Sequence, residues 1–339
     1  MKKSRVGFLV LMAVLAVKSP AQEKAPLRLL QTIPLPEGVH NHWEHFGVDV
    51  EGHRLFLGSE DAPVVEVFDL RTNKHIRAIT GFGEPNNIMV RPDLNEIFVV
   101  DGGASEIKIL KGDSYEVVGR TELTIDADSI VYDPATKFLY VVNGGRAAHN
   151  PYCLLSIMDT TSGKKLADIR LDVDQLESMA IEKSGPRLFI NMMGGNEIGV
   201  VDREKRALVQ TWPLTQGKNN GPMALDEANH RLFVVTRTPP KLVVLDTETG
   251  KEITSLAVGG GAADMNFDPA SKRIYVSCGA GFITVVEQRG ANDYQVIGNI
   301  PTKSGAKNGI LVPALGRYYV AVPKKGEQEA QVLVYEVVP

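Results

Sequence analysis

The chain has 339 residues, of which 43% are hydrophobic and 23% charged, a composition that excludes a disordered or largely membrane-embedded protein. Its formal net charge is −4, from 41 acidic and 37 basic residues. Because nucleic-acid-binding proteins usually carry a basic face, this balance argues against nucleic acid as a partner.

The first 21 residues are typical of a secretory signal peptide. Basic residues at positions 2, 3 and 5 precede an apolar run over 6–17 that is too short to span a bilayer, and Ser19-Pro20-Ala21 offers small residues to a signal peptidase. We expect cleavage after Ala21 and a periplasmic or secreted protein; the alternative is an uncleaved membrane anchor. Cleavage removes four of the 37 basic residues, leaving 33 against 41 acidic ones and a net charge of −8. No other segment approaches the length of a membrane span.

Seven pairs of apolar or aromatic residues recur at nearly constant spacing along the rest of the chain. Counted on the second residue of each pair, the steps are 42, 42, 49, 44, 42 and 44 residues. The pairs are Leu55-Phe56, Ile97-Phe98, Leu139-Tyr140, Leu188-Phe189, Leu232-Phe233, Ile274-Tyr275 and Tyr318-Tyr319. A period of about 40 to 45 residues made of short alternating strands is typical of a β-propeller with one blade per repeat. We therefore expect an all-β, seven-bladed propeller of four-stranded antiparallel blades, as one domain over 22–339.

Each repeat has the same internal order of strands and turns. In the third repeat, strands are expected at 128–132, 138–143, 154–159 and 166–171, separated by turns rich in Asp, Pro, Ser and Gly. The expected blades cover about 42–80, 84–123, 126–171, 176–214, 220–258, 261–302 and 306–338. The last repeat lacks a fourth strand, and the segment RLLQTIPL at 28–35 matches ALVQTWPL at 207–214, a fourth strand elsewhere. We expect residues 27–36 to join the last blade and close the ring, because an open ring would expose two sheet edges.

Three short motifs in these repeats carry a family resemblance. They are Tyr140-Val141-Val142-Asn143, the segment IMDTTSGK at 157–164 and the segment LDTETGK at 245–251. The first is similar to the Tyr-Val-Thr-Asn signature, and the others to the third strand and following turn, of the YVTN-repeat propellers, which include the YncE-like proteins. Other blades replace the signature, for example with Val99-Val100-Asp101. The resemblance implies seven blades, an exported protein and, for most members, no known enzymatic activity; single-stranded DNA binding is ascribed to one branch.

Alignment of the repeats places two rings of residues at the mouth of the central channel, just before each inner strand. The first ring is Glu44, Asn86, Asp128, Glu177, Gly221, Ala263 and Asn308. The second is His45, Asn87, Ser129, Ser178, Pro222, Asp264 and Gly309. Oxygen ligands suit Ca²⁺ or Mg²⁺, so the candidate metal ligands are Glu44, Asn86, Asp128 and Glu177. The alternative is that these residues bind channel water and cap neighbouring backbone groups.

Three of the seven histidines, His40, His42 and His45, lie in the segment that enters the first blade. Residues two apart on a strand share a face, so His40 and His42 would point together with Glu44, as a possible Zn²⁺ ligand set. His42 and His45 are also the candidates for moving a proton in catalysis. The alternative is a loop whose histidines bond backbone carbonyl groups.

Loops that follow the second strand of each blade share this face and supply further candidate ligand-binding residues. With the channel residues they make up the set Asn87, Asp101, Asn143, Arg146, His149, Asn191, Arg237 and Asn308. The arginines suit an anionic or sugar-like ligand, because guanidinium groups pair with carboxylate or phosphate. The alternative is that these loops carry no function.

Three functions stay open on the sequence alone. The favoured one is an exported, non-catalytic binding protein, expected to be monomeric, that presents a site for a small molecule, glycan or protein at the channel mouth. The second is a metal-dependent enzyme, a lactonase-like hydrolase or a polysaccharide lyase, with the cation held by the four candidate metal ligands. The third is single-stranded nucleic-acid binding, which needs stacking aromatic residues beside basic ones. No Gly-x-Ser-x-Gly elbow, Walker loop or Rossmann glycine fingerprint is present.

Overall fold

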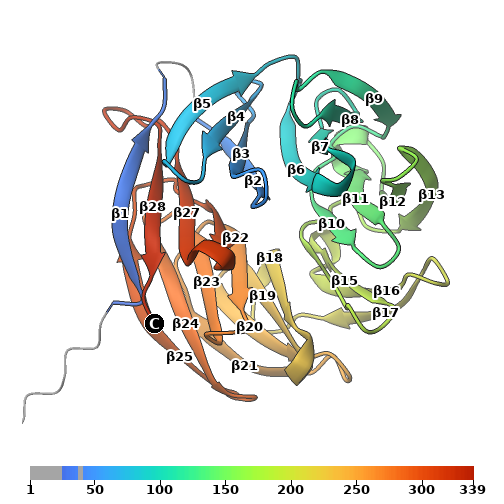
Figure 1. Ribbon diagram of the computed structural model, residues 1–339. Helices are drawn as coiled ribbons and strands as arrows, with labels where there is room; N and C mark the ends of the chain where they lie inside the picture. Colours follow the sequence, from blue (N-terminus) through green and yellow to red (C-terminus); the bar gives the residue numbers. More distant parts are fainter. Residues whose placement is uncertain (1–24, 37–40) are drawn as a thin grey trace, which may run out of the picture.

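The computed structural model describes residues 25–36 and 41–339. They form seven four-stranded antiparallel sheets that stand as blades around a common centre (Figure 1), which confirms the predicted seven-bladed β-propeller. The first blade holds β2 (Trp43–Asp49), β3 (Arg54–Ser59), β4 (Val64–Asp69) and β5 (Lys74–Ile79). The second holds β6 (Pro85–Arg91), β7 (Glu96–Asp101), β8 (Glu106–Lys111) and β9 (Val117–Glu122). The third holds β10 (Ile130–Asp133), β11 (Phe138–Gly144), β12 (Cys153–Asp159) and β13 (Lys164–Leu171).

The remaining blades repeat this order. The fourth holds β14 (Met179–Ile181), β15 (Arg187–Met192), β16 (Glu197–Asp202) and β17 (Ala207–Pro213). The fifth holds β18 (Lys218–Asp226), β19 (Arg231–Thr238), β20 (Pro240–Asp246) and β21 (Glu252–Ala257). The sixth holds β22 (Ala262–Asp268), β23 (Arg273–Cys278), β24 (Phe282–Gly290) and β25 (Asp293–Pro301). Short 3₁₀ turns lie at η1 (Pro92–Leu94), η2 (Gly145–Ala148), η3 (Met193–Gly195), η4 (Glu227–Asn229) and η5 (Pro313–Leu315).

The N-terminal strand completes the seventh blade. β1 (Leu27–Pro34) pairs antiparallel with β28 (Gln331–Val337), followed inward by β27 (Arg317–Val322) and β26 (Asn308–Val312). The prediction that residues near the N-terminus close the ring is therefore confirmed. A second link joins the first and last blades, because the indole N–H of Trp43 donates to the carbonyl of Val322 at 2.9 Å. Together these contacts cover the sheet edges that an open ring would expose.

Turns between strands use local side-chain hydrogen bonds and glycine. After β12, the Asp159 carboxylate accepts from the Thr161 N–H at 2.9 Å and the Ser162 hydroxyl at 2.8 Å. Gly163 then takes a φ of +68°, which costs glycine little because it has no Cβ. The turn after β20 repeats this device with Asp246 and Gly250, as the matching sequence motifs lead one to expect.

The repeated aromatic positions form the core between neighbouring blades. The second residue of each predicted pair is at most 1% exposed: Phe56, Phe98, Tyr140, Phe189, Phe233, Tyr275 and Tyr319. In one of the interblade clusters, Phe98 and Val100 of β7 lie with Leu139 and Val141 of β11. Burying a side chain of this size contributes about 1.5–3 kcal/mol, so the repeats that predict the fold also hold the ring together.

Three further observations concern membrane-spanning helices, the expected signal peptide and the cysteines. Within residues 25–36 and 41–339 there is no helix with the length and apolar character needed to cross a bilayer. The expected signal peptide at 1–21 lies outside the described residues. Cys153 and Cys278 are buried free thiols in different blades.

Candidate functional site

The inner strands converge on a small cavity at the centre of the ring. Its volume is about 140 Å³, and its lining includes the second-ring residues of six blades: His45, Asn87, Ser129, Ser178, Pro222 and Asp264. An adjoining cavity of about 170 Å³ shares His45, Asn87 and Asp264 with it. The aligned repeats thus bring these positions to one level of the central channel.

His45 on β2 is the centre of a network of charges in this channel. Its Nδ1 lies 2.7 Å from Oδ1 of Asp264, and its Nε2 lies 3.9 Å from Oδ1 of Asp128. The other oxygen of Asp264 accepts the Gly309 N–H at 2.9 Å, which fixes this carboxylate in place. Burial alone would lower the pKa of His45, but Asp264, Asp128 and Glu44 outweigh it and raise that pKa to about 10.

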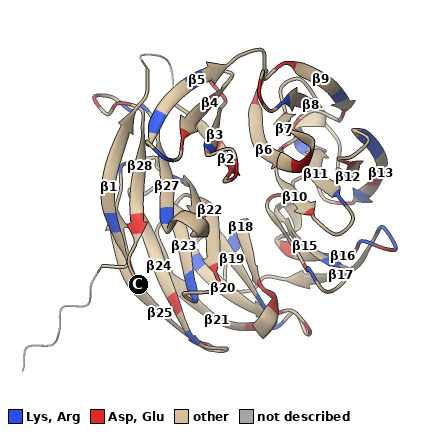
Figure 2. Cartoon of the chain, in the orientation of Figure 1, with Lys and Arg blue, Asp and Glu red and all other residues tan. Residues whose placement is uncertain are grey.

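Asp128 lies on the Nε2 side of the His45 ring, and Glu44 is close to both residues. One ligand atom from each of Glu44, His45 and Asp128 falls within 4.8 Å of the other two. Burial raises the pKa of Glu44 to about 7, with Asp128 adding to the shift and His45 opposing it. Burial likewise raises the pKa of Asp128, and its Oδ1 is shielded from solvent without a hydrogen-bond partner. Figure 2 marks acidic residues at the end of β2 nearest the centre of the ring.

Glu177 extends the same network across the channel. Its two carboxylate oxygens accept from the two terminal nitrogens of Arg237 at 3.1 and 3.2 Å. Burial raises the pKa of Glu177 in spite of this partner. Asp126, whose pKa burial also raises, interacts with both Glu177 and Asp128. The first-ring residues Glu44, Asp128 and Glu177 therefore belong to one electrostatically connected group.

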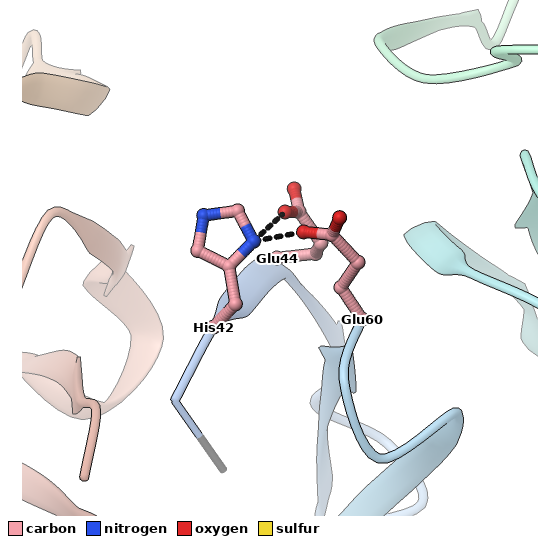
Figure 3. Close-up of side chains that lie close together, drawn as sticks. All are labelled: His42, Glu44 and Glu60. Carbon is pink, nitrogen blue, oxygen red and sulfur yellow. Dashed lines mark hydrogen bonds and ion pairs between the residues drawn. The ribbon is translucent and has the colours of Figure 1, made fainter.

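His42 lies in a second group beside the first, which Figure 3 shows. Its Nδ1 points at the carboxylates of Glu60 and Glu44, with the Glu44 oxygen 3.5 Å away. Its Nε2 accepts from the Lys307 ammonium at 3.0 Å. Burial and Lys307 lower the pKa of His42, which favours the neutral ring. His40, the third candidate of this segment, lies outside the described residues.

Several other predicted site residues hold the scaffold. Asn86 donates to the Ala127 carbonyl at 2.9 Å and so links the second blade to the third. Asp101 is fully buried and paired with Lys108 at 2.6 Å, and it accepts from the backbone of Gly83. Asn143 donates to Ser156 at 2.8 Å and Asn191 donates to the Gly221 carbonyl at 2.6 Å. Asn308 is buried at the start of β26.

Arg146 and His149 lie in a different place from the channel group. They line a wide surface pocket of about 670 Å³ between the third and fourth blades, together with Asp172, Asp174 and Gly194. Arg146 is exposed and pairs with Asp174 through Nε at 3.1 Å. The acidic residues beside it compensate its charge, so the pocket offers no unpaired cation for an anionic ligand.

Asp264, Lys307 and Glu60 are contacts of the channel histidines that were not among the predicted site residues. Asp264 occupies the same aligned position in the sixth blade as His45 does in the first. This shared position was the one feature of the sequence that could have identified Asp264 as a site residue. Its pairing with His45 joins residues 219 positions apart in the chain. Such a contact across the ring depends on side-chain direction, which a repeat alignment does not give.

Comparisons with known proteins found relatives in sequence but no matching family model. No family model matches the chain. Two curated relatives are similar to it over 206 residues, the "Uncharacterized protein YncE" of Salmonella typhimurium at 24% identity and that of Salmonella typhi at 23%. Each match covers 60% of this chain and 56% of the relative, little more than half of that protein's length.

A solved structure shares the fold. A chain of Kuenenia stuttgartiensis hydrazine synthase superimposes with a TM-score of 0.73 at 17% identity, over 85% of this chain and 94% of that one. At this identity the likeness concerns the fold alone. The homologues of the chain are thus YncE-like proteins, and its seven-bladed architecture is consistent with a YncE-like propeller.

Proposed function

We propose that this protein is an exported, non-catalytic binding propeller that holds a small, positively charged ligand at the mouth of its central channel. The sequence pattern of residues 1–21 supports export, since it combines a basic start, a short apolar run and a small-residue cleavage site. The channel group described above supports the choice of ligand charge.

One observation carries the proposal, the unequal charge in the channel mouth. Five carboxylates interact there, and with three positive partners they leave a deficit of two positive charges when all are ionised. The carboxylates are Glu44, Asp126, Asp128, Glu177 and Asp264, and the positive partners are His45, Arg237 and Lys307. Burial makes this deficit costly, which is why the pKa of Glu44 rises to about 7. A bound cation would relieve it.

The available space limits the ligand. The cavity lined by Asp126, Asp128 and Glu177 measures about 120 Å³, and the two lined by His45 and Asp264 measure about 140 and 170 Å³. A water molecule occupies about 30 Å³ of the liquid. Such volumes admit a hydrated metal ion, or the ammonium end of a larger molecule whose remainder stays outside.

Thermal and chemical stability in the presence of defined cations tests the proposal. The probes are Zn²⁺, Ca²⁺ and spermidine, each compared with sodium sulfate at equal ionic strength. A ligand at one hundred times its dissociation constant stabilises the folded protein by about 2.7 kcal/mol. We expect stabilisation by at least one probe, and its loss in the double variant Glu44→Gln/Asp128→Asn. Asp293→Asn, at an exposed carboxylate of β25, is the matched control. Equal responses of the wild type to all cations and to sodium sulfate would refute the proposal.

A further inference from the structure

The two ring nitrogens of His45 differ in what they contact. Nδ1 is held by the carboxylate of Asp264 at 2.7 Å, and Asp264 is itself held by the Gly309 N–H at 2.9 Å. Nε2 has its nearest acidic oxygen, Oδ1 of Asp128, at 3.9 Å, which is beyond hydrogen-bond distance. Asp264 thus fixes the orientation of the imidazole, and Nε2 faces the channel without a hydrogen bond. The carboxylates that raise the pKa of His45 hold a proton on Nε2, and a metal ion that binds there would displace it.

The groups around Nε2 are also short of partners. Oδ1 of Asp128 is shielded from solvent and accepts no hydrogen bond, an arrangement that costs free energy unless something positive lies between the groups. A carboxylate oxygen of Glu44 is also near, since one ligand atom from each of Glu44, His45 and Asp128 lies within 4.8 Å of the other two. These separations exceed hydrogen-bond length, and an ion between the atoms would draw them together, since ligand atoms about 2.0–2.2 Å from a tetrahedral Zn²⁺ lie about 3.3–3.6 Å apart.

We propose that His45 Nε2, Glu44 and Asp128 bind a divalent transition-metal ion, with Zn²⁺ the best fit, and that Asp264 is the positioning residue that orients His45. One imidazole nitrogen and two carboxylates form a mixed N/O ligand set of the kind that zinc accepts, whereas Ca²⁺ and Mg²⁺ prefer oxygen alone. Histidine ligands of metals commonly donate their other ring N–H to a carboxylate, which is the part that Asp264 would play.

The neighbouring His42 group shows why the site is assigned to His45. Figure 3 shows the Nδ1 of His42 facing Glu60 and Glu44. Its Nε2, on the other side of the ring, accepts from Lys307 at 3.0 Å. One neutral tautomer, with its proton on Nδ1, therefore satisfies both nitrogens with protein partners. A cation bound there would also sit beside the Lys307 ammonium. This group also joins a histidine to two carboxylates, but both of its ring nitrogens have hydrogen-bond partners.

This inference rests on the proposed function, because it concerns the same channel mouth and specifies which cation binds. Three protein ligands leave a coordination position open, as in zinc sites that bind water or a ligand group. His45 also lines the channel cavity of about 140 Å³, and Asp128 lines a separate cavity of about 120 Å³ with Asp126 and Glu177. The metal would then be the part of the site that a small ligand contacts.

Calorimetric titration of the chelator-treated protein with ZnCl₂, and absorption spectra with Co²⁺, test the assignment. We expect one equivalent of metal, with loss of stoichiometric binding in His45→Gln and Asp128→Asn. Asp264→Asn, which keeps the ligands but removes the orienting carboxylate, should weaken binding about 10- to 100-fold. His42→Gln should retain stoichiometric binding. His230→Gln, at an exposed histidine beside η4, is the control for nonspecific imidazole binding.

A measurement on the wild-type protein tests the assignment independently of whether the variants fold. Anomalous diffraction at the zinc edge from crystals grown with ZnCl₂ should place one peak between His45 Nε2 and the two carboxylates. A peak at His42 and Glu60, or retention of binding in His45→Gln with loss in His42→Gln, overturns the assignment. Stabilisation by spermidine without stoichiometric Zn²⁺ binding overturns the metal site and leaves the proposed function standing. Absence of any cation binding overturns both.

Discussion

Ring closure by β1 can be tested at a single side chain, Ile33. It is 3% exposed and packs in a cluster that includes Val332 and Val334 of β28 and Trp43 of the first blade. Replacing it by alanine removes three buried carbon atoms at the junction of the first and last blades. Substitutions of this type cost about 2–5 kcal/mol, and Ile33→Val should cost about 0.5–1.5 kcal/mol.

The same strand provides the matched control. Leu30, three residues earlier, is 42% exposed, so Leu30→Ala should change the free energy of unfolding by no more than about 0.5 kcal/mol. Urea denaturation followed by tryptophan fluorescence measures all three variants, and Trp43 reports directly on the junction. Equal losses for Ile33→Ala and Leu30→Ala, or no loss for either, would refute closure by burial of β1.

Two further predictions concern buried charge. Lys108→Met leaves the fully buried Asp101 without its ammonium partner at 2.6 Å, so a loss of about 3–5 kcal/mol is expected in urea denaturation. Arg289→Met, which breaks a surface pair, should cost less than about 1 kcal/mol, and similar losses in the two variants would contradict this account. The pKa of Glu44 is raised from 4.5 to about 7, so the folded state binds more protons than the unfolded state in this range, and Glu44 lowers stability as pH rises from about 4.5 to 7. Glu44→Gln should remove this loss, by up to about 3 kcal/mol at pH 8 relative to pH 4.5, and parallel stability–pH curves for variant and wild type would argue against it.

Local chemistry explains how far the architecture could be predicted. The apolar pairs recur because the second strand of each blade is buried between neighbouring blades. The Asp–Gly turns recur because the hairpins that contain them need the same backbone shape. β1 was recognisable because its segment matches β17, a strand with the same place in another blade. These features depend on neighbours within one repeat, and that is the information a repeat carries.

The candidate site depends on contacts of another kind. The alignment put Glu44, Asp128 and Glu177 at one level of the channel, but it gave no reason to distinguish them from Asn86, whose amide bonds the next blade's backbone. It also offered no sign that Asp101 would be buried beside Lys108. Whether a polar side chain faces the channel or the sheet depends on its rotamer and on its neighbours across the blade.

Blade number and strand order follow from the spacing of apolar residues, because burial in a propeller repeats along the chain, and the strand that closes the ring follows from its match to β17. The partners of the charged residues follow from the closed ring, which sets His45 of the first blade against Asp264 of the sixth and Glu177 against Arg237 of the fifth. Ion pairs and hydrogen bonds need atoms within about 4 Å of each other, so these pairs depend on the placement of the blades around one axis.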